Sequence, residues 1–409
     1  MKKILFNRIH FLLLSCLALV VLQLSSCKDE DMDVPVITAV RNYDVAPNDT
    51  LVDVLVPGQF VVLEGAHLQE AMMISFNGIP ATFNKALFAD NYAVVRVPDV
   101  IPFPLVAEED MNTIKYVTPA GETTFNFNIV AGAPMVAGVF NENPVEGETV
   151  VIGGTNLFLI EEVDFGGAII TEFETSIDGT TLAFTMPASS TSGPVSITTA
   201  SGTSETAFNV NDLTTGMLCN FDDIGWLSWG TGTSDNDPDF PGSHGRYPIL
   251  DTGILGAGDW AWWNGGRSIN IGDQTPQWVP VAELDQPVAN YALKFEMNIS
   301  GEWNGVSLLI LKDGSWNYLI RYEPWKISET KTTNVSTGGK WLTVTIPLTE
   351  FRNKKDGDDG TGDSATSLTQ LLGSSGAGGI NFFTINAGSA PTPIGLRVAI
   401  DNIRVVKIK

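Results

Sequence analysis

Tryptophan is confined to one part of this chain. All ten Trp residues follow residue 215, and the first 215 residues contain none. An indole ring is flat and electron-rich, so an exposed one can stack on an apolar, slightly positive face such as the axial C–H face of a pyranose ring. The densest group is Trp260, Trp262 and Trp263, and the glycines around it favour a loop or a sheet edge over a core strand. The region after residue 215 is therefore expected to have a task of its own, and these three rings are its first candidate stacking platforms.

Other candidates lie further along the chain. Trp303 occupies a turn-like segment, and Trp325 follows Pro324. Trp316 and Tyr322 would share one face of a strand, which could form either the binding surface or the core. Arg321 could donate hydrogen bonds to sugar hydroxyl groups. Three further rings are assigned to packing: Trp226, Trp229 and Trp341. The role of Trp278 is left undecided.

The region that carries these rings has the pattern of a β-protein. Residues 291–299 alternate, with Leu293 and Phe295 on one face and Lys294 and Glu296 on the other. Asp-Gly at 313–314 is a turn-forming pair between two apolar runs, which predicts a hairpin. The expected strands are residues 291–299, 306–311, 316–322, 341–348 and one or two strands within 396–406.

The first half of the chain contains a repeat. Residues 58–68 and 147–157 share a pattern of glycines and apolar residues at an offset of 89 residues, and Phe76-Asn77-Gly78 aligns with Phe165-Gly166-Gly167 at the same offset. Such self-similarity indicates two copies of one supersecondary unit. Short apolar runs between turn signals, without a long helical period, predict that each copy is a β-sandwich. Gly65 and Gly154 are expected to permit a tight turn or a bulge after a buried strand.

The N-terminus has the composition of an export signal. Basic residues precede an apolar run at 11–24, which is too short to span a bilayer and suits a signal peptide. The segment Leu24-Ser25-Ser26-Cys27 resembles a bacterial lipobox, which implies lipidation of Cys27; an ordinary secretory signal is the alternative. The expected segments are a signal peptide at 1–26, an acidic linker at 27–33, sandwiches at 34–131 and 132–211, and a C-terminal domain at 215–409.

Charge and residue counts exclude several functions. The chain carries 23 Lys+Arg against 47 Asp+Glu, a formal net charge of −24, so it lacks the cations that nucleic acids and anionic membrane surfaces attract. Three His and three Cys do not support a multi-His metal site or a disulfide framework. Acidic loops at 235–239 and 356–363 offer oxygen ligands for Ca²⁺, but neither has EF-hand spacing. We therefore expect no cofactor and no resident metal, and a small buried Cys219.

Two resemblances extend these expectations. The repeat pattern resembles the IPT/TIG family of immunoglobulin-like domains. The opening Asn220-Phe221-Asp222, the central Gly339-Lys340-Trp341 and the closing Ile400-Asp401-Asn402-Ile403 resemble jelly-roll carbohydrate-binding modules. The order of lipid Cys, two Ig-like domains and a Trp-rich sandwich resembles the surface glycan-binding protein B class of Bacteroidetes polysaccharide utilisation loci.

That resemblance implies a function and a location. It implies an all-β lipoprotein, anchored through its N-terminal lipid on the outer face of the outer membrane, that captures a polysaccharide beside a TonB-dependent SusC/SusD-like importer. The implied ligand is a β-glucan, with β-1,3 or mixed-linkage glucan first and xyloglucan next. The acidic residues after Cys27 resemble the export tag of such lipoproteins.

Two rival functions remain open from the sequence. A protein-binding adhesin would use the Ig-like domains as its recognition surface. A glycoside hydrolase would need two carboxylates about 5–9 Å apart on either side of the sugar. Most acidic residues of the C-terminal region lie in Gly-rich loops, and nucleophile-elbow and zinc-protease motifs are absent from the sequence. We therefore expect a non-catalytic protein.

Overall fold

The computed structural model describes residues 33–188, 191–243 and 245–409. The expected signal peptide, Cys27 and all of the acidic linker except Asp33 lie outside these residues. The chain divides into two compact units, Met1–Gly132 and Ala133–Lys409. In the described part of the chain, no helix has both the length and the apolar character that crossing a membrane requires.

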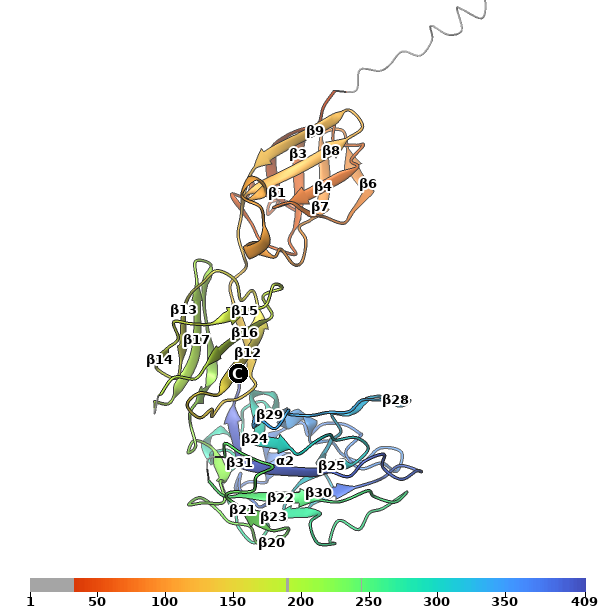
Figure 1. Cartoon of the computed structure of the whole chain (residues 1–409). Helices are drawn as coiled ribbons and strands as arrows, with labels where there is room; N and C mark the ends of the chain where they lie inside the picture. Colours follow the sequence, from red (N-terminus) through yellow and green to blue (C-terminus); the bar gives the residue numbers. More distant parts are fainter. Residues whose placement is uncertain (1–32, 189–190, 244) are drawn as a thin grey trace, which may run out of the picture. The chain divides into compact units, whose positions relative to one another are not determined.

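The described residues of the first unit form an Ig-like β-sandwich, which we call the N-terminal sandwich (Figure 1). One sheet has the strand order β1-β3-β7-β6 and the other β5-β4-β8-β9, while β2 and β10 form a short parallel pair. The strands are β1 (Val36–Asn42), β2 (Val54–Leu55), β3 (Phe60–Ala66), β4 (Met73–Phe76), β5 (Ile79–Pro80), β6 (Phe83–Ala89), β7 (Tyr92–Arg96), β8 (Thr113–Thr118), β9 (Gly121–Asn126) and β10 (Asn128–Ile129).

The second unit begins with another Ig-like β-sandwich, the middle sandwich. Its sheets have the orders β11-β12-β16-β15 and β14-β13-β17-β18, which repeat the orders of the N-terminal sandwich strand for strand. The predicted duplication is thus confirmed. The strands are β11 (Met135–Val139), β12 (Thr149–Thr155), β13 (Ile160–Phe165), β14 (Ala168–Ile169), β15 (Glu174–Thr175), β16 (Thr181–Thr185), β17 (Gly193–Thr199) and β18 (Gly202–Val210).

The repeated glycines have the same role in both copies. Each lies where the pairing of the first two strands shifts register, opposite the start of the first strand. A Cβ on Gly65 would lie 1.8 Å from the carbonyl oxygen of Val36, and one on Gly154 would lie 2.1 Å from that of Met135. Only glycine lets the two backbones approach this closely, so the predicted bulge is present in each copy.

The aligned Phe-x-Gly segments form matching hairpins. Asn77 and Gly78 have φ of 48° and 75°, and Gly166 and Gly167 have φ of 64° and 90°. Two successive residues with positive φ are the signature of a type I′ turn, whose twist matches that of the strands it joins. The turns connect β4 to β5 and β13 to β14. The aligned residues of the two copies therefore dictate one local geometry.

The remainder of the second unit is a larger β-sandwich, the C-terminal sandwich, and the all-β architecture expected from the sequence is confirmed. One sheet has the order β21-β22-β31-β24-β29, with β19 also on β31, and the other has the order β20-β23-β30-β25-β26. Its elements are β19 (Met217–Cys219), β20 (Trp229–Gly230), β21 (Thr233–Ser234), β22 (Tyr247–Asp251), β23 (Ser268–Asn270), β24 (Tyr291–Ile299), β25 (Ser307–Lys312), β26 (Leu319–Tyr322), β27 (Lys326–Ser328), β28 (Lys331–Thr332), β29 (Leu342–Pro347), α2 (Leu368–Leu372), β30 (Ile380–Ile385) and β31 (Arg397–Lys407).

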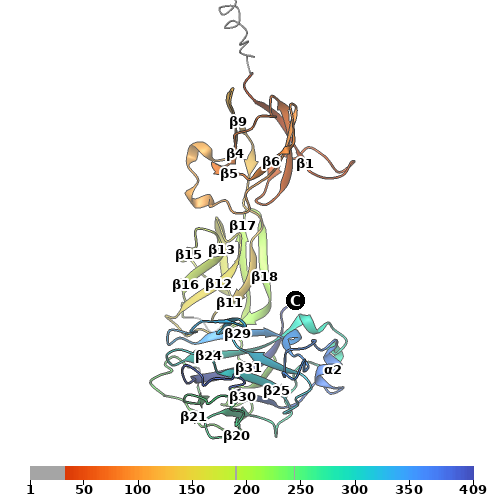
Figure 2. The same ribbon diagram turned by 90° about the vertical axis from the view of Figure 1, so that its right-hand side faces the viewer.

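Strand β24 is buried on both faces. Leu293 and Phe295 enter the core between the two sheets, as the alternation predicts. Lys294 and Glu296 on the opposite face are also buried, because that face packs against the middle sandwich. Figures 1 and 2 show β24 and β29 beside the middle sandwich, with β20 on the far side of the C-terminal sandwich.

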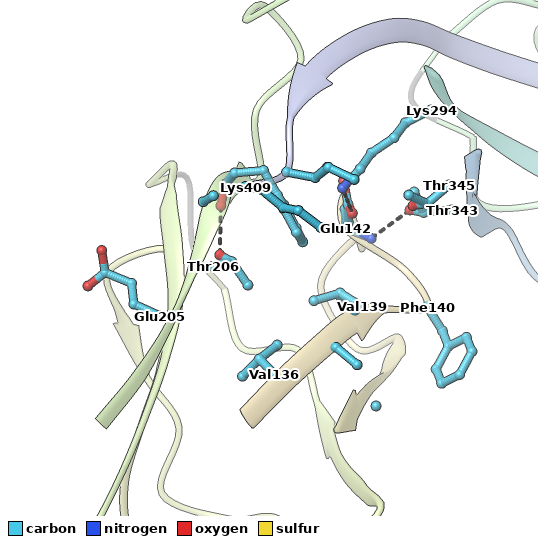
Figure 3. Close-up of a pocket in the computed structure, with 16 residues that line it drawn as sticks. Val136, Val139, Phe140, Glu142, Glu205, Thr206, Lys294, Thr343, Thr345 and Lys409 are labelled. Atoms are coloured by element: carbon cyan, nitrogen blue, oxygen red, sulfur yellow. Dashed lines mark hydrogen bonds and ion pairs between the residues drawn. The ribbon is translucent and has the colours of Figure 1, made fainter. Parts of the chain in front are cut away.

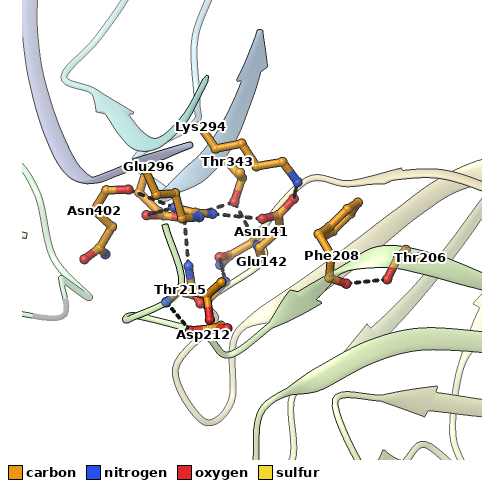
Figure 4. Close-up of polar contacts among 12 residues, drawn as sticks. Asn141, Glu142, Thr206, Phe208, Asp212, Thr215, Lys294, Glu296, Thr343 and Asn402 are labelled. Carbon is orange, nitrogen blue, oxygen red and sulfur yellow. Dashed lines mark hydrogen bonds and ion pairs between the residues drawn. The ribbon is translucent and has the colours of Figure 1, made fainter. Parts of the chain in front are cut away.

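A cluster of four charged side chains joins the two sandwiches (Figure 4). Glu142, from the middle sandwich, pairs with both Lys294 and Arg404, and Arg404 also pairs with Glu296 at 2.9 Å. These side chains are 1–3% exposed. Two anions face two cations, so the cluster is neutral and each charge has a partner, as burial of charge requires. We call these four residues the joint cluster.

Hydrogen bonds and one ring contact extend the joint. The backbone N–H of Thr343 donates to the carbonyl oxygen of Phe140 at 2.7 Å, and the N–H of Glu142 donates to the Thr343 hydroxyl at 2.9 Å. The Lys294 ammonium also lies 3.2 Å from the ring centroid of Phe208 on β18, a cation–π contact. The middle sandwich is therefore packed and bonded to the C-terminal sandwich.

Asp401 lies next to the joint cluster, and its protonation should make the stability of the protein depend on pH. Burial, then the charges of Glu296 and Asp222, raise its pKa to about 8, although Arg404 opposes the shift. Between about pH 4 and pH 8 the folded protein thus holds a proton that the unfolded chain releases, so stability falls as pH rises through this window. We expect Asp401→Asn to stabilise the protein at pH 8 and to have little effect at pH 4. Urea unfolding at both pH values checks this, and an equal effect at the two would contradict it.

Candidate functional site

The sheet that faces away from the middle sandwich has two distinct apolar faces. On β25, Leu308 belongs to the main core and Leu309 to a second cluster; on β30, Phe382 and Phe383 divide in the same way. This alternation places the second cluster on the outer face of the sheet. Its buried members are Leu309, Leu311, Leu319, Phe383 and Ile385, and Trp260 and Trp262 pack against it.

Five Trp side chains gather over this outer face, and we call them the aromatic shelf. Trp229 comes from the edge strand β20, three come from the loop between β22 and β23, and one comes from the turn between β25 and β26. The loop leads into β23 and the turn joins β25 to β26. All three strands belong to the sheet that contains β20, so the five rings converge on that sheet. The shelf consists of Trp229, Trp260, Trp262, Trp263 and Trp316.

Trp262 is the centre of the aromatic shelf. Its ring stacks on Phe383 with a centroid distance of 4.0 Å and an interplanar angle of 12°. Trp229 lies 6.0 Å and Trp263 5.5 Å from Trp262. On the other side, Trp316 lies 6.3 Å from Phe383 and 6.4 Å from Trp260. The rings therefore form two contacting groups, which Phe383 of the apolar cluster joins.

The shelf presents ring surface to solvent. Trp263 is 63% exposed, Trp229 48% and Trp316 37%, while Trp260 and Trp262 are half-buried. Scattered exposed apolar residues are common on proteins, whereas a patch of several large exposed rings is typical of interaction sites. Four of the rings, all except Trp229, were candidates from the sequence, and the structure brings those four together.

Three other sequence candidates are not on the shelf. Trp303 is fully buried, and its indole N–H donates to the carbonyl oxygen of Val306, so it is a core residue and offers no platform. Trp325 is half-buried, packs against the same core and donates to the same carbonyl oxygen at 2.8 Å. Tyr322 also packs against this core, and burial raises its pKa to about 12.

The expected common face for Trp316 and Tyr322 is wrong. Strand β26 begins only at Leu319, and residues 316–318 form bends instead of extended strand. The period of two therefore does not run from Trp316 to Tyr322, and the two rings lie on opposite faces of the sheet. Tyr318 is also drawn away from the shelf, packing against the main core while its hydroxyl accepts a hydrogen bond from Gln370.

Arg321 lies on the outer face of β26, but it is turned into the protein. Its side chain is 12% exposed, with Nε donating to the carbonyl oxygen of Asp359 and Nη1 to Glu323. A residue held in this way braces the loop at 353–363. The role of Arg321 as a hydrogen-bond donor to a ligand stays a prediction.

Two Trp residues assigned to packing are exposed. Trp229 is part of the shelf, and Trp226 is 58% exposed. The glycines at 230 and 232 are the signal that could have identified Trp229, because they resemble those around Trp263. Trp341 and Trp278 are buried packing residues.

Charge near the shelf is neutralised. Three shelf residues lie in residues 259–267, which we call the shelf loop, and its end residues Asp259 and Arg267 form an ion pair at 2.9 Å. The hydrogen bond from Arg267 holds the pKa of Asp259 below its ordinary value. The shelf thus combines apolar ring surface with a paired, internally satisfied charge, an arrangement that favours a neutral ligand.

Aspartates of both acidic loops form ion pairs with Arg and Lys side chains of the same protein. Asp237 and Asp239 pair with Arg397, and Asp359 pairs with Lys354. No group of three or more His, Cys, Asp or Glu side chains within the described ranges is arranged to hold a metal ion. Cys219 is buried, as expected, and burial raises its pKa to about 12.

A cavity of about 730 Å³ lies beside the joint cluster (Figure 3). Its walls include Val136 and Val139 of the middle sandwich and Thr345 of the C-terminal sandwich. Lys294 and Glu142 reach it, but they pair with each other. The cavity thus offers a ligand mainly apolar walls, and the aromatic shelf is the better candidate for a long ligand because it is open.

The C-terminal half of the chain matches a known domain family. Residues 210–407 match the family model described as the surface glycan-binding protein B xyloglucan binding domain. The crystal structure of surface glycan-binding protein PbSGBP-B from Prevotella bryantii is similar over 92% of this chain and 99% of that chain, with 25% identity and a TM-score of 0.66.

Two further relatives agree in fold or sequence. SGBP-B from a complex xyloglucan utilization locus in Bacteroides uniformis shares the fold over 91% of this chain and 99% of its own, with 21% identity and a TM-score of 0.51. An IPT/TIG domain-containing protein from Bacteroides ovatus is 25% identical over 153 residues, which is 37% of this chain. The match spans about a third of that relative's length, 31%.

Proposed function

Because residues 210–407 match the family model of the surface glycan-binding protein B xyloglucan binding domain, we propose that this protein binds a neutral β-glucan chain without cleaving it, on the aromatic shelf. The single observation that carries the proposal is the aromatic shelf on the outer face of the C-terminal sandwich, two groups of contacting Trp rings joined through Phe383, with Trp229, Trp263 and Trp316 exposed.

Stacking explains how such a surface holds a sugar chain. Each pyranose that covers an indole removes apolar area from water, while its equatorial hydroxyl groups keep their hydrogen bonds at the ring edge. By analogy with base stacking, one platform contributes about 1–3 kcal/mol. Two or three platforms together contribute about 4–6 kcal/mol, which corresponds to a Kd between about 1 mM and tens of µM. Such weak binding suits a protein that must pass its ligand on.

Charge favours a neutral glycan over an acidic one. The chain has a formal net charge of −24, so it repels polyanions such as polyuronates over the range of a Debye length. Arg267, at the end of the shelf loop, is already paired with Asp259. Neutral glucans meet neither obstacle.

Among neutral β-glucans, xyloglucan is the first candidate. The domain family supports this choice, and it reverses the order expected from the sequence, in which β-1,3 and mixed-linkage glucans came first. Those two glucans therefore form the comparison arms of the test.

The proposal includes a place and a partner. A surface glycan-binding protein acts outside the cell, and lipidation at Cys27 would anchor it to the outer membrane. A TonB-dependent SusC/SusD-like importer would take the captured glycan. The N-terminal residues that carry the anchor lie outside those that the structure describes.

Affinity gel electrophoresis tests the proposal directly. The protein is run through gels that contain xyloglucan, mixed-linkage β-glucan, β-1,3-glucan, starch or polygalacturonate. We expect retardation in at least one β-glucan gel, with xyloglucan the strongest, and normal migration in polygalacturonate. Normal migration in all three β-glucan gels would refute the proposal, and release of reducing ends from the retarding glucan would show that the protein is a hydrolase.

A further inference from the structure

The shelf loop, residues 259–267, is tied at both ends. It is the later part of the connection from β22 in one sheet to β23 in the other. At one end, the N–H of Asn386 donates to the carbonyl oxygen of Asp259 at 2.9 Å. At the other, the N–H and hydroxyl of Thr384 both donate to the carbonyl oxygen of Arg267. Both ties reach the end of β30.

One ion pair connects the two tied ends to each other. Arg267 Nη1 donates to Asp259 Oδ1 at 2.9 Å and lies 3.4 Å from the carbonyl oxygen of Ala261, inside the loop. Asp259 Oδ1 also accepts the N–H of Ala261 at 3.0 Å. The side chains are only 13% and 22% exposed, so solvent screens this pair less than a typical surface pair.

Asn386 fixes the approach to the loop. It is 4% exposed, and its Nδ2 donates to the carbonyl oxygens of Gly256 and Ala390 at 2.7 and 2.8 Å. Its Oδ1 accepts the N–H of Gly388 at 2.9 Å. One carboxamide thus joins the residues before the shelf loop to those after β30.

We propose that Asp259, Arg267 and Asn386 form a clasp that holds Trp260, Trp262 and Trp263 in the arrangement that receives a ligand. They are positioning residues, because their contacts are with the loop and the end of β30, and they act through the Trp rings. The inference rests on the proposed function of the shelf. A glycine-rich loop has many conformations to lose, so fixing it before the ligand arrives reduces the entropy lost on binding.

The test compares the full-length Arg267→Gln variant with the full-length wild type. We expect the variant to bind the retarding glucan roughly tenfold more weakly, with a more unfavourable binding entropy in calorimetry. Acrylamide should quench its Trp fluorescence more strongly, because released rings become more exposed. Its unfolding midpoint in urea should stay close to that of the wild type, because the ties lie outside the main core. Arg267→Lys, which keeps the charge, should recover part of the affinity.

A matched control removes an ion pair from a loop that has no Trp. Arg352 pairs with Glu350 and donates to the carbonyl oxygen of Gly362, so it braces residues 353–363. Arg352→Gln should leave both affinity and quenching unchanged. Equal quenching in wild type and Arg267→Gln, or a changed quenching with unchanged affinity, would overturn the clasp. If the wild type binds no glucan, the proposed function fails, and quenching still decides whether Arg267 holds the rings.

Discussion

Replacing Trp262 with Ala is expected to abolish most glucan binding. Trp262 stacks on Phe383 and contacts two other shelf rings, so its loss removes one platform and the support of its neighbours. Losing a platform alone costs about 1–3 kcal/mol, a roughly 5- to 150-fold weaker affinity. Loss of the support should bring the effect to the upper end of that range.

Isothermal titration with an oligosaccharide of the retarding glucan measures this effect. Trp226→Ala is the matched control, because Trp226 is 58% exposed on the same sandwich but outside the shelf, and it should bind like the wild type. Trp263→Ala adds a shelf variant whose exposed ring can be removed with little effect on folding. Wild-type affinity in both shelf variants, or an equal loss in Trp226→Ala, would contradict the shelf as the binding surface.

Glu142→Gln is expected to destabilise the C-terminal sandwich, although Glu142 belongs to the middle sandwich. It leaves Lys294 and Arg404 facing only Glu296, so one buried positive charge has no counterion. Breaking a buried ion pair from one side costs about 3–5 kcal/mol. Because all ten Trp residues lie after residue 215, Trp fluorescence during urea unfolding reports on the C-terminal sandwich alone.

Two further variants isolate the charge effect. Glu205→Gln makes the same chemical change at an exposed residue that lines the same cavity, and it should alter stability by less than about 0.5 kcal/mol. Glu142→Gln combined with Lys294→Met restores neutrality and should be less destabilised than the sum of its single variants. An unchanged unfolding curve for Glu142→Gln would mean that the joint cluster contributes nothing to the stability of the C-terminal sandwich.

Local patterns in the sequence were sufficient for the architecture. Gly65 and Gly154 permit backbone contacts that no other residue allows. The sequence repeat that contains them therefore predicted two sandwiches, and the two have the same strand order. The confinement of Trp to the residues after 215 indicated the domain to which we assign binding, because composition needs no three-dimensional information. Trp260, Trp262 and Trp263 were predicted to be exposed stacking platforms from the glycines around them, which are also read directly from the sequence.

Only the tertiary structure decided which aromatic and charged residues face solvent. Trp303 and Trp229 both have glycine neighbours, yet the first fills the core and the second lies on the shelf, because burial depends on what packs against a segment from elsewhere in the chain. Lys294 and Glu296 have the pattern of a solvated strand face, and a second sandwich covers them. A period of two fixes which side chains share a face, but the identity of the layer opposite that face is set by contacts between residues far apart in sequence.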